Sequence, residues 1–236
     1  ERANALLAGP GHAPRQLLAS MKVEVICTTD DPADSLEHHR RLVLEEQKSG
    51  SGGPEAPTSG LQMQPAFRPD RVFAISDPRA YREYLERLEG ASGSRIRSYA
   101  DLLVALEQRL EHFSRHGCRI ADHSFGALPY FDTPHCDIDK LFDRVLQGTP
   151  PNPEEQAYFT FELLRQLCSR YHHRGWVQQF HLGALRNSNP RIFARQGPDS
   201  GCDSIGDRLQ ADALAGFLGS LEQSGTLAKT ILYTLN

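Results

Sequence analysis

Four short segments of the chain carry residue types that can bind an anion or move a proton. They read TTDDP (28–32), FRPD (67–70), ADHS (121–124) and FHLGALRN (180–187). Arginine suits a carboxylate because its planar guanidinium can bind both oxygens, and histidine either titrates near neutral pH or binds a metal ion. We therefore expect a site for a small anionic substrate. Arg68 and Arg186, with Arg191 as a third candidate, would be its cations. His123 and His181 would be its titrating or metal-binding groups.

Each polar segment lies at the end of an apolar run that is typical of a buried strand. These runs alternate with longer amphipathic segments, which indicates βα units and an α/β fold with a parallel sheet. Five strands are predicted, at 23–29, 61–67, 118–123, 176–182 and 229–235, and the second contains Pro65. The carboxyl ends of parallel strands meet at one edge, so the four polar segments should lie close together.

Two architectures fit five parallel strands, namely a doubly wound sheet and an arc of a (β/α)8 TIM barrel. A nucleotide-binding doubly wound sheet has a glycine-rich phosphate loop after its first strand, but TTDDP follows that strand here. Reactive residues at the ends of several strands are typical of the barrel. A complete barrel takes about 250 residues and eight strands. We therefore expect one partial barrel domain over 1–236, within a longer protein, since the chain begins at Glu1 rather than Met.

Cap residues mark four helices. They are expected at 77–90, 98–117, 152–171 and 209–225. Asp77 and Ser98 serve as N-caps, while Asn152 begins a pattern close to a capping box. Gly90, Gly117 and Gly225 are the expected stops. The stretch 48–60 is rich in Gly, Ser and Pro and predicts a flexible surface loop.

Several candidate residues also have simpler interpretations. Asp30 or Asp31 could be the N-cap of the helical pattern that follows Pro32, and Asp70 could be a turn residue. His123 could be an ordinary buried histidine. The adjacent pairs at 38–39 and 172–173 are expected on solvated helix faces, where neighbouring side chains point about 100° apart and cannot chelate one ion.

The composition disfavours several classes of protein. The chain has 236 residues, 39% of them hydrophobic, and a formal net charge of −4, which indicates a globular protein and gives no basic surface for nucleic acid. No run approaches the roughly 18 apolar residues of a membrane span. The five cysteines are odd in number and form no C-x-x-C pair, so they fit small packing groups in a reduced cytoplasmic compartment.

Six segments together resemble the uronate isomerase (glucuronate isomerase) family. They read VEVICTTDDPADSLEHH, PAFRPD, GCRIADHS, QFHLGALRNSNPRIF, GPDSGCDSIGD and KTILYTLN, in the family's order and over nearly the whole chain. The most specific are CTTDDP and FHLGALRNSNPRIF. The family belongs to the amidohydrolase superfamily of metal-dependent (β/α)8 barrels. Its members interconvert D-glucuronate with D-fructuronate, and D-galacturonate with D-tagaturonate, in bacterial hexuronate catabolism.

The resemblance implies roles for individual residues. Arg68 would hold the carboxylate or a hydroxyl of the uronate sugar, and Arg186 would add positive charge. His181 would lie near the reacting oxygens or the metal. Asp122 and His123 would form a polar pair beside the site. One would be the base and the other would orient it, and the sequence does not assign the two roles. A homo-oligomer is compatible with this picture.

The resemblance also implies that parts of the family pattern are outside this chain. Family members carry a His-x-His metal pair on the first strand and a metal-binding aspartate on the last, and neither occurs here. The chain would then contain about strands two to six, would lack the principal ligands of a divalent metal, most plausibly zinc, and would be inactive alone. Two alternatives remain open: a metal-dependent hydrolase of the same superfamily, and an inactive structural fragment.

Overall fold

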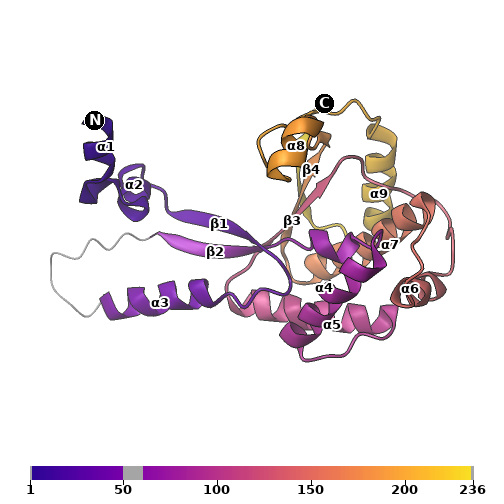
Figure 1. Cartoon of the computed structure of the whole chain (residues 1–236). Coiled ribbons are helices and arrows are strands. Elements are labelled where there is room, and N and C mark those ends of the chain that lie inside the picture. The colour runs from indigo at the N-terminus through magenta and orange to yellow at the C-terminus, as the bar shows by residue number, and fades with distance from the viewer. Residues whose placement is uncertain (1, 50–60, 235–236) are drawn as a thin grey trace.

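The computed structural model describes residues 2–49 and 61–234 and contains a five-stranded parallel sheet. The strand order is β1-β2-β3-β4-β7, which confirms the predicted α/β fold (Figure 1). The strands are β1 Val25–Asp30, β2 Gln62–Phe67, β3 Ile120–Phe125, β4 Val177–Leu182 and β7 Lys229–Thr234. Residues 50–60 of the predicted loop at 48–60 lie outside the described part of the chain.

Helices occupy most of the chain between these strands. They are α1 Arg2–Leu7, α2 Pro14–Ser20, α3 Glu37–Ser49, α4 Pro78–Ser92, α5 Tyr99–Arg115, α6 Ile138–Leu146, α7 Pro153–His173, α8 Pro190–Gln196 and α9 Ala211–Gln223. Two 3-10 turns, η1 Pro10–His12 and η2 Asp70–Phe73, and a short antiparallel pair, β5 Ala184–Leu185 with β6 Ser204–Ile205, complete the fold. Among the described residues, no helix combines the length and the apolar character needed to cross a bilayer.

The helix starts follow the cap signals more closely than the helix ends do. The side chains of Asp77 and Ser98 cap α4 and α5, and Asn152 forms a complete capping box with Glu155. The predicted stop at Gly90 is wrong, because α4 continues to Ser92. Gly93, at φ 75°, provides the left-handed conformation that ends it.

Two further expectations about helix starts are also wrong. Asp30 belongs to β1 and Asp31 to the following loop, so neither caps α3, which begins at Glu37. Leu209 is 99% exposed and precedes α9 rather than facing the core.

The hydrophobic core lies between the sheet and its covering helices. The ring of Phe67 contacts Phe113 of α5 and Tyr171 of α7 edge-on, with centroids 5.1 and 6.2 Å apart. Buried residues are distributed very unevenly along the chain. Among the side chains that the structure describes within 2–49 and 61–64, only those of Pro32, Leu36 and His39 are buried.

The pairing of the strands is uneven as well. β1 pairs with β2, β3 with β4, and β4 with β7 over six residues each, whereas β2 pairs with β3 only at Phe67 and Ala121. β1, β2 and α3 consequently extend away from the main body (Figure 1).

The cysteines are all free. Cys118 and Cys168 are buried, as expected for packing groups, but Cys27 is exposed and does not pack in the core.

Candidate functional site at the carboxyl ends of the strands

A buried carboxylate joins three strand ends into one group. Asp122 on β3 is 1% exposed, and its Oδ2 lies 3.1 Å from Nη1 of Arg68, the residue after β2. Its Oδ1 accepts a hydrogen bond from Gln179 Nε2 at 2.9 Å and lies 2.8 Å from His181 Nδ1. The His181 contact is an ion-pair distance without the alignment of a hydrogen bond.

The strand register explains why these side chains meet. In the β3–β4 ladder Asp122 pairs with Gln179, and Ser124 pairs with His181. Side chains two residues apart on a strand share a face, so Gln179 and His181 both face the side of the sheet that carries Asp122. The Phe67–Ala121 pair then places Arg68 beside Asp122.

Arg68 also binds a second carboxylate, since its Nε lies 2.9 Å from Asp70 Oδ2. Burial acts to lower the pKa of Arg68, but the hydrogen bond and charge of Asp70 and the charge of Asp122 outweigh it and raise the pKa. Burial raises the pKa of Asp70, with the Arg68 contact opposing part of the effect. Arg68 is thus a fixed cation held between two acids.

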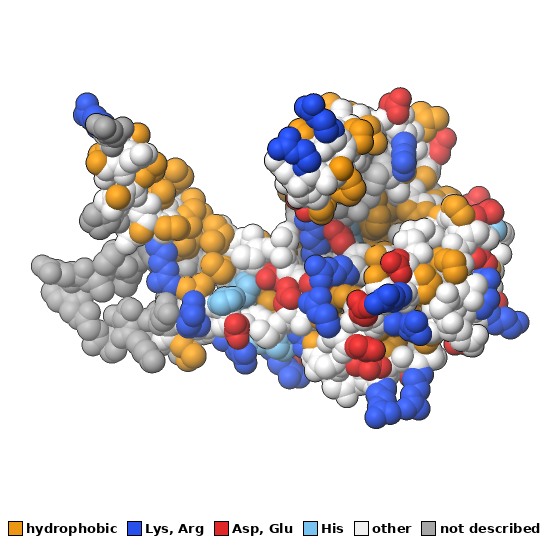
Figure 2. Space-filling model, viewed as in Figure 1, with side chains coloured by type: hydrophobic (Ala, Val, Ile, Leu, Met, Phe, Trp, Pro, Cys, Tyr) orange, Lys and Arg blue, Asp and Glu red, His pale blue; other side chains and the backbone are white. Residues whose placement is uncertain are grey.

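A polar cavity of about 840 Å³ opens beside Arg68 and Asp70, whereas Asp122, Gln179 and His181 do not line it. The sequence predicted Arg68 and Arg186 for this place. The complete lining is Thr29, Asp31, Asp34, Arg68, Asp70, Arg71, Arg87, Ser124, Arg186, Asn187 and Asp199. Basic and acidic side chains are intermixed on the face shown in Figure 2. Both signs of charge therefore surround a space large enough for a sugar acid.

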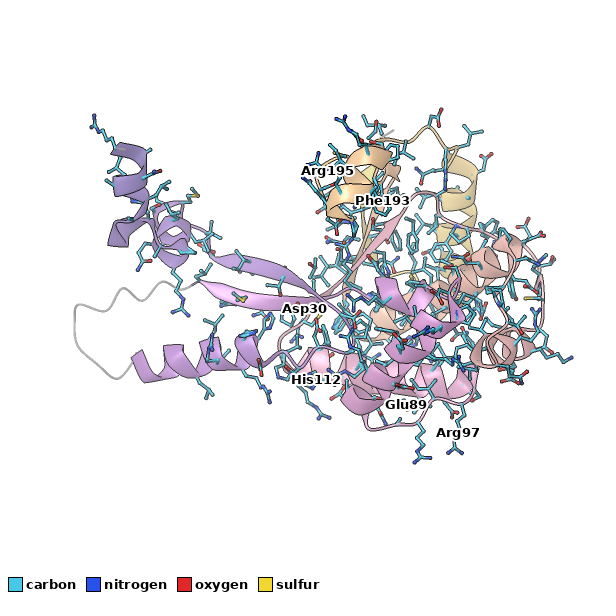
Figure 3. All side chains as sticks on the ribbon, in the orientation of Figure 1. Asp30, Glu89, Arg97, His112, Phe193 and Arg195 are labelled. Atoms are coloured by element: carbon cyan, nitrogen blue, oxygen red, sulfur yellow. The ribbon has the colours of Figure 1, made fainter. Side chains whose placement is uncertain are left out.

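Arg186 reaches the cavity from the segment after β4. Its Nη1 lies 2.5 Å from Asp203 Oδ2, and the same carboxylate accepts from the Asn187 N–H at 3.0 Å through Oδ1. The charge of Arg186 is therefore partly neutralised within its own loop. This loop leads into α8, on which Phe193 and Arg195 are labelled in Figure 3.

His123 is not brought into this group. It pairs in register with Phe180 and its side chain lies on the opposite face from Asp122, fully buried against rings of the helix-facing core. Neither ring nitrogen has a hydrogen-bond partner among the described residues. Burial, with a smaller effect of the Arg68 charge, lowers the pKa of His123 to about 3. The predicted polar pair of Asp122 and His123 is thus divided between two faces of β3.

Some residues in and beside the site were missed by the sequence interpretation. Asp31 was read as a helix cap, and Gln179 was passed over although it stands two residues before His181 on one strand. That spacing of two was the signal that could have found it. Arg71 and Arg87 carried no comparable signal, because α4 brings Arg87 to the cavity only through tertiary packing.

The expectation for one adjacent histidine pair is partly wrong. His39 is buried, and its Nε2 lies 2.8 Å from Thr28 Oγ1, which donates to Asp30 Oδ2 at 2.6 Å. Figure 3 labels Asp30 at the end of β1. His38 is exposed, as are the predicted solvated residues 172 and 173.

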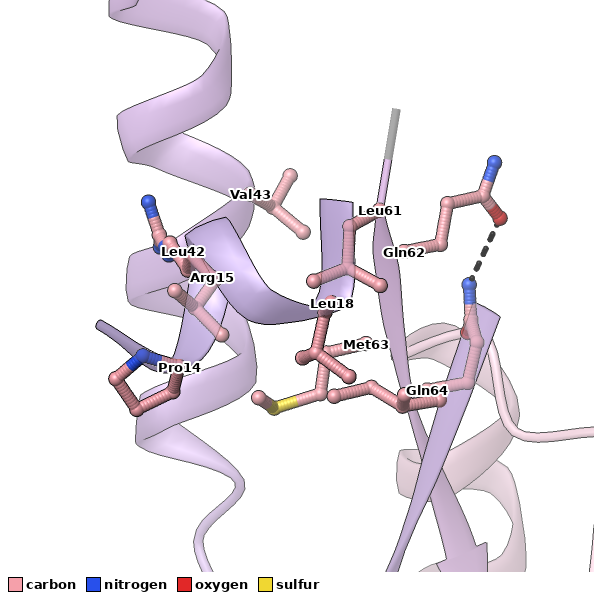
Figure 4. A pocket seen from close by; sticks show the side chains of 10 residues that line it. Pro14, Arg15, Leu18, Leu42, Val43, Leu61, Gln62, Met63 and Gln64 are labelled. Carbon is pink, nitrogen blue, oxygen red and sulfur yellow. Dashed lines mark hydrogen bonds between the residues drawn. The ribbon is translucent and has the colours of Figure 1, made fainter. Parts of the chain in front are cut away.

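A second, mostly apolar pocket of about 390 Å³ lies beside α2, α3 and the start of β2 (Figure 4). Leu18, Leu42 and Leu61 line it. It shares no lining residue with the polar cavity, so we do not assign it to the same site.

The described residues do not form a metal centre by themselves. No group of three His, Cys, Asp or Glu side chains within 2–49 and 61–234 is placed to hold an ion. His181 turns Nδ1 toward Asp122, which leaves only Nε2 for a ligand of any kind. No chemical step is therefore assigned to a metal here.

The protein is part of a (β/α)8 barrel. It has a parallel sheet with helices between the strands, and its polar site lies at the carboxyl ends of the strands, where the active sites of barrel enzymes lie. The chain belongs to the glucuronate isomerase family, whose sequence model matches residues 1–236.

Relatives and solved structures agree with this membership. The chain is 39% identical over 236 residues to a uronate isomerase of Serratia proteamaculans, covering all of this chain and 48% of the relative. It superposes on the uronate isomerase of Thermotoga maritima with a TM-score of 0.80 at 30% identity, over 94% of this chain and 46% of the other. It superposes on the glucuronate isomerase of Caulobacter crescentus with a TM-score of 0.81 at 29% identity, over 100% of this chain and 46% of the other. The chain thus spans about half the length of these proteins.

Proposed function

We propose that the whole protein is a uronate isomerase that converts D-glucuronate to D-fructuronate and D-galacturonate to D-tagaturonate. The observation that carries this proposal is the contact of Arg68, which lines the polar cavity, and of His181 with one buried carboxylate, Asp122. Family membership supports the same reaction class.

The proposed reaction moves two protons. The proton on C2 is removed and one is delivered to C1, while a proton passes from O2 to O1, so that the aldehyde becomes a hydroxymethyl group and C2 becomes a ketone. Such a reaction needs a base, a clamp on the substrate and a polar environment for the developing charge on oxygen.

The residues of the site suit these tasks. Arg68 binds the uronate carboxylate or a neighbouring hydroxyl, and Arg186 adds positive charge at the cavity wall. Asp122 lies 2.8 Å from Nδ1 of His181, which leaves Nε2 of the ring as the candidate base. The third predicted catalytic residue, His123, has no path to the cavity in this geometry and is left out of the proposed mechanism.

The resemblance also implies a divalent metal ion, with zinc as the best candidate. Its principal ligands would come from strands outside this chain, and His181 is the candidate ligand within it. A soluble uronate sugar as substrate, a cytoplasmic location and a homo-oligomeric assembly belong to the same proposal.

Isomerisation by the full-length protein tests the proposal. D-glucuronate and D-galacturonate are incubated with the purified protein, and the appearance of the ketose is followed by NMR. Ketose formation is the expected result. Absence of ketose, together with hydrolysis of a lactone or an amide, would assign the protein to the hydrolases of the superfamily instead.

The 236-residue chain alone should be inactive, because five strands cannot close a barrel. The same NMR assay with the isolated chain tests this expectation. Ketose formation at a rate near that of the full-length protein would overturn it.

A further inference from the structure

The loop over residues 31–36, between β1 and α3, forms one wall of the polar cavity. Asp31 and Asp34 line that cavity together with Arg68. Within the loop, Asp31 Oδ1 accepts from the Ala33 N–H and Asp34 Oδ2 accepts from the Asp31 N–H, both at 2.9 Å. The internal hydrogen bonds of the loop therefore use one oxygen of each carboxylate. The second oxygen of each remains for a ligand in the cavity.

A buried arginine on α5 anchors this loop. Arg109 is only 5% exposed, and its Nε donates to the Pro32 carbonyl at 2.6 Å. Its Nη2 donates to the Asp34 carbonyl at 2.8 Å, and its Nη1 to the Ala91 carbonyl of α4 at 2.7 Å. One guanidinium thus ties the loop to two helices of the outer layer.

The partners of Arg109 are neutral carbonyls rather than a carboxylate, which is an expensive way to bury a charge. Burial lowers the pKa of Arg109 accordingly. A hydrophobic side chain would fill the same space without that cost. Arginine, however, is the one residue whose side chain can hold several carbonyls in a fixed arrangement, because its planar guanidinium carries five N–H donors.

Tyr84 of α4 provides a second tie to the same loop. Its hydroxyl donates to Asp31 Oδ1 at 3.1 Å, on the oxygen that already accepts from Ala33. Leu36 is buried and has a φ of 55°, a conformation that a non-glycine residue adopts only under local constraint. The loop is therefore held at its start, middle and end.

We propose that Arg109 is a positioning residue of the substrate cavity. It fixes the 31–36 loop so that the remaining oxygens of Asp31 and Asp34 accept hydrogen bonds from substrate hydroxyl groups. This inference rests on the proposed function, since a uronate offers one carboxylate for Arg68 and several hydroxyls for the acidic wall. Arg109 contacts no substrate itself and acts on substrate binding through the loop.

Kinetics of the full-length protein test this role. Arg109→Gln should raise KM for D-glucuronate about 10-fold or more, because the displaced loop no longer offers its carboxylates to the substrate hydroxyls, while kcat changes less. The KM of Arg109→Lys should lie between those of wild type and Arg109→Gln, since lysine keeps the charge but not the planar fork of donors. Arg115→Gln is the matched control: Arg115 lies on the same helix, is exposed and pairs with Glu111 at 3.0 Å. It should leave both constants unchanged.

A double-mutant cycle separates positioning from general structural support. If Arg109 acts through the acidic wall, Asp31→Asn should add little to the KM of the Arg109→Gln variant. Additive losses, an unchanged KM or a loss confined to kcat would overturn the proposal.

Hydrogen exchange of the full-length protein provides a measurement that needs no substrate. Arg109→Gln should speed exchange of the Ala33 and Asp34 amides and leave β4 unchanged. Faster exchange throughout the sheet, or none in the loop, would overturn the anchoring. If the wild-type protein proved not to isomerise uronates, this measurement would still decide the anchoring separately from the function.

Discussion

His123 is the predicted catalytic residue whose surroundings differ most from the sequence expectation, and His123→Phe tests its placement. The histidine ring lies among Phe125, Tyr171 and Phe180, with centroids 5.6 to 6.0 Å away. A phenylalanine ring fits that environment and removes two buried nitrogens that lack hydrogen-bond partners. We expect kcat and KM of the full-length protein to stay within a few-fold of wild type.

The stability effect depends on pH in a defined direction. The pKa of His123 is about 3 in the folded protein and near 6.5 in the unfolded chain, so the unfolded state binds more protons between these values. The stability that comes from a neutral His123 is complete above pH 6.5 and is lost as the pH falls toward 3. The loss is about 1.4 kcal/mol per pH unit, or roughly 2.7 kcal/mol between pH 6.5 and pH 4.5.

Chemical denaturation at pH 7.5 and pH 4.5 measures this effect. The measured quantity is the free energy of unfolding of His123→Phe minus that of wild type. This difference should be about 2–3 kcal/mol larger at pH 4.5 than at pH 7.5. His173→Phe, at an exposed position, should show no such pH-dependent difference. A His123→Phe variant with the same acid sensitivity as wild type, or one that folds but loses kcat by orders of magnitude, would refute the placement.

Three further substitutions test the site and the helix that supports it. Asp122→Asn keeps the shape but removes the charge that Arg68 and His181 contact, and should lower kcat/KM of the full-length protein about 10- to 100-fold in steady-state assays. In Arg68→Lys the lysine lacks the planar fork that binds two carboxylates, so KM should rise about 10-fold. A smaller rise would contradict the proposal that Arg68 binds the substrate. Asn152→Ala removes the capping box of α7 and should destabilise the protein by about 1 kcal/mol in thermal denaturation, without altering KM.

The fold could be predicted because its signals are local. All five apolar runs became strands with boundaries within two residues of those expected, Pro65 included, and the cap residues Asp77, Ser98 and Asn152 began their helices. The failure at Gly90 has the same origin, since a glycine within a helix is permitted when packing on both sides favours the helix.

The site could be predicted only in part because side-chain contacts depend on register. Adjacent residues on a strand point to opposite faces, so ADHS could contribute either Asp122 or His123 to one site but not both. The pairing with β4 decides which of the two lies on the same side as His181, and this pairing is a long-range property. The ties of Arg109 and Tyr84 to the 31–36 loop join residues more than fifty positions apart and leave no periodic trace in the sequence.

The single residue pair between β2 and β3 has a consequence for cooperativity. Few of the residues before Pro65 whose burial the structure describes are buried, so we expect β1, α3 and β2 to open as a unit while the remaining sheet stays folded. The Arg68 contact with Asp122 crosses this boundary, as do those of Arg109 with Pro32 and Asp34. A ligand bound across the same boundary would suppress the partial opening by mass action. Occupancy of the cavity and resistance of β1 to limited proteolysis should therefore rise together.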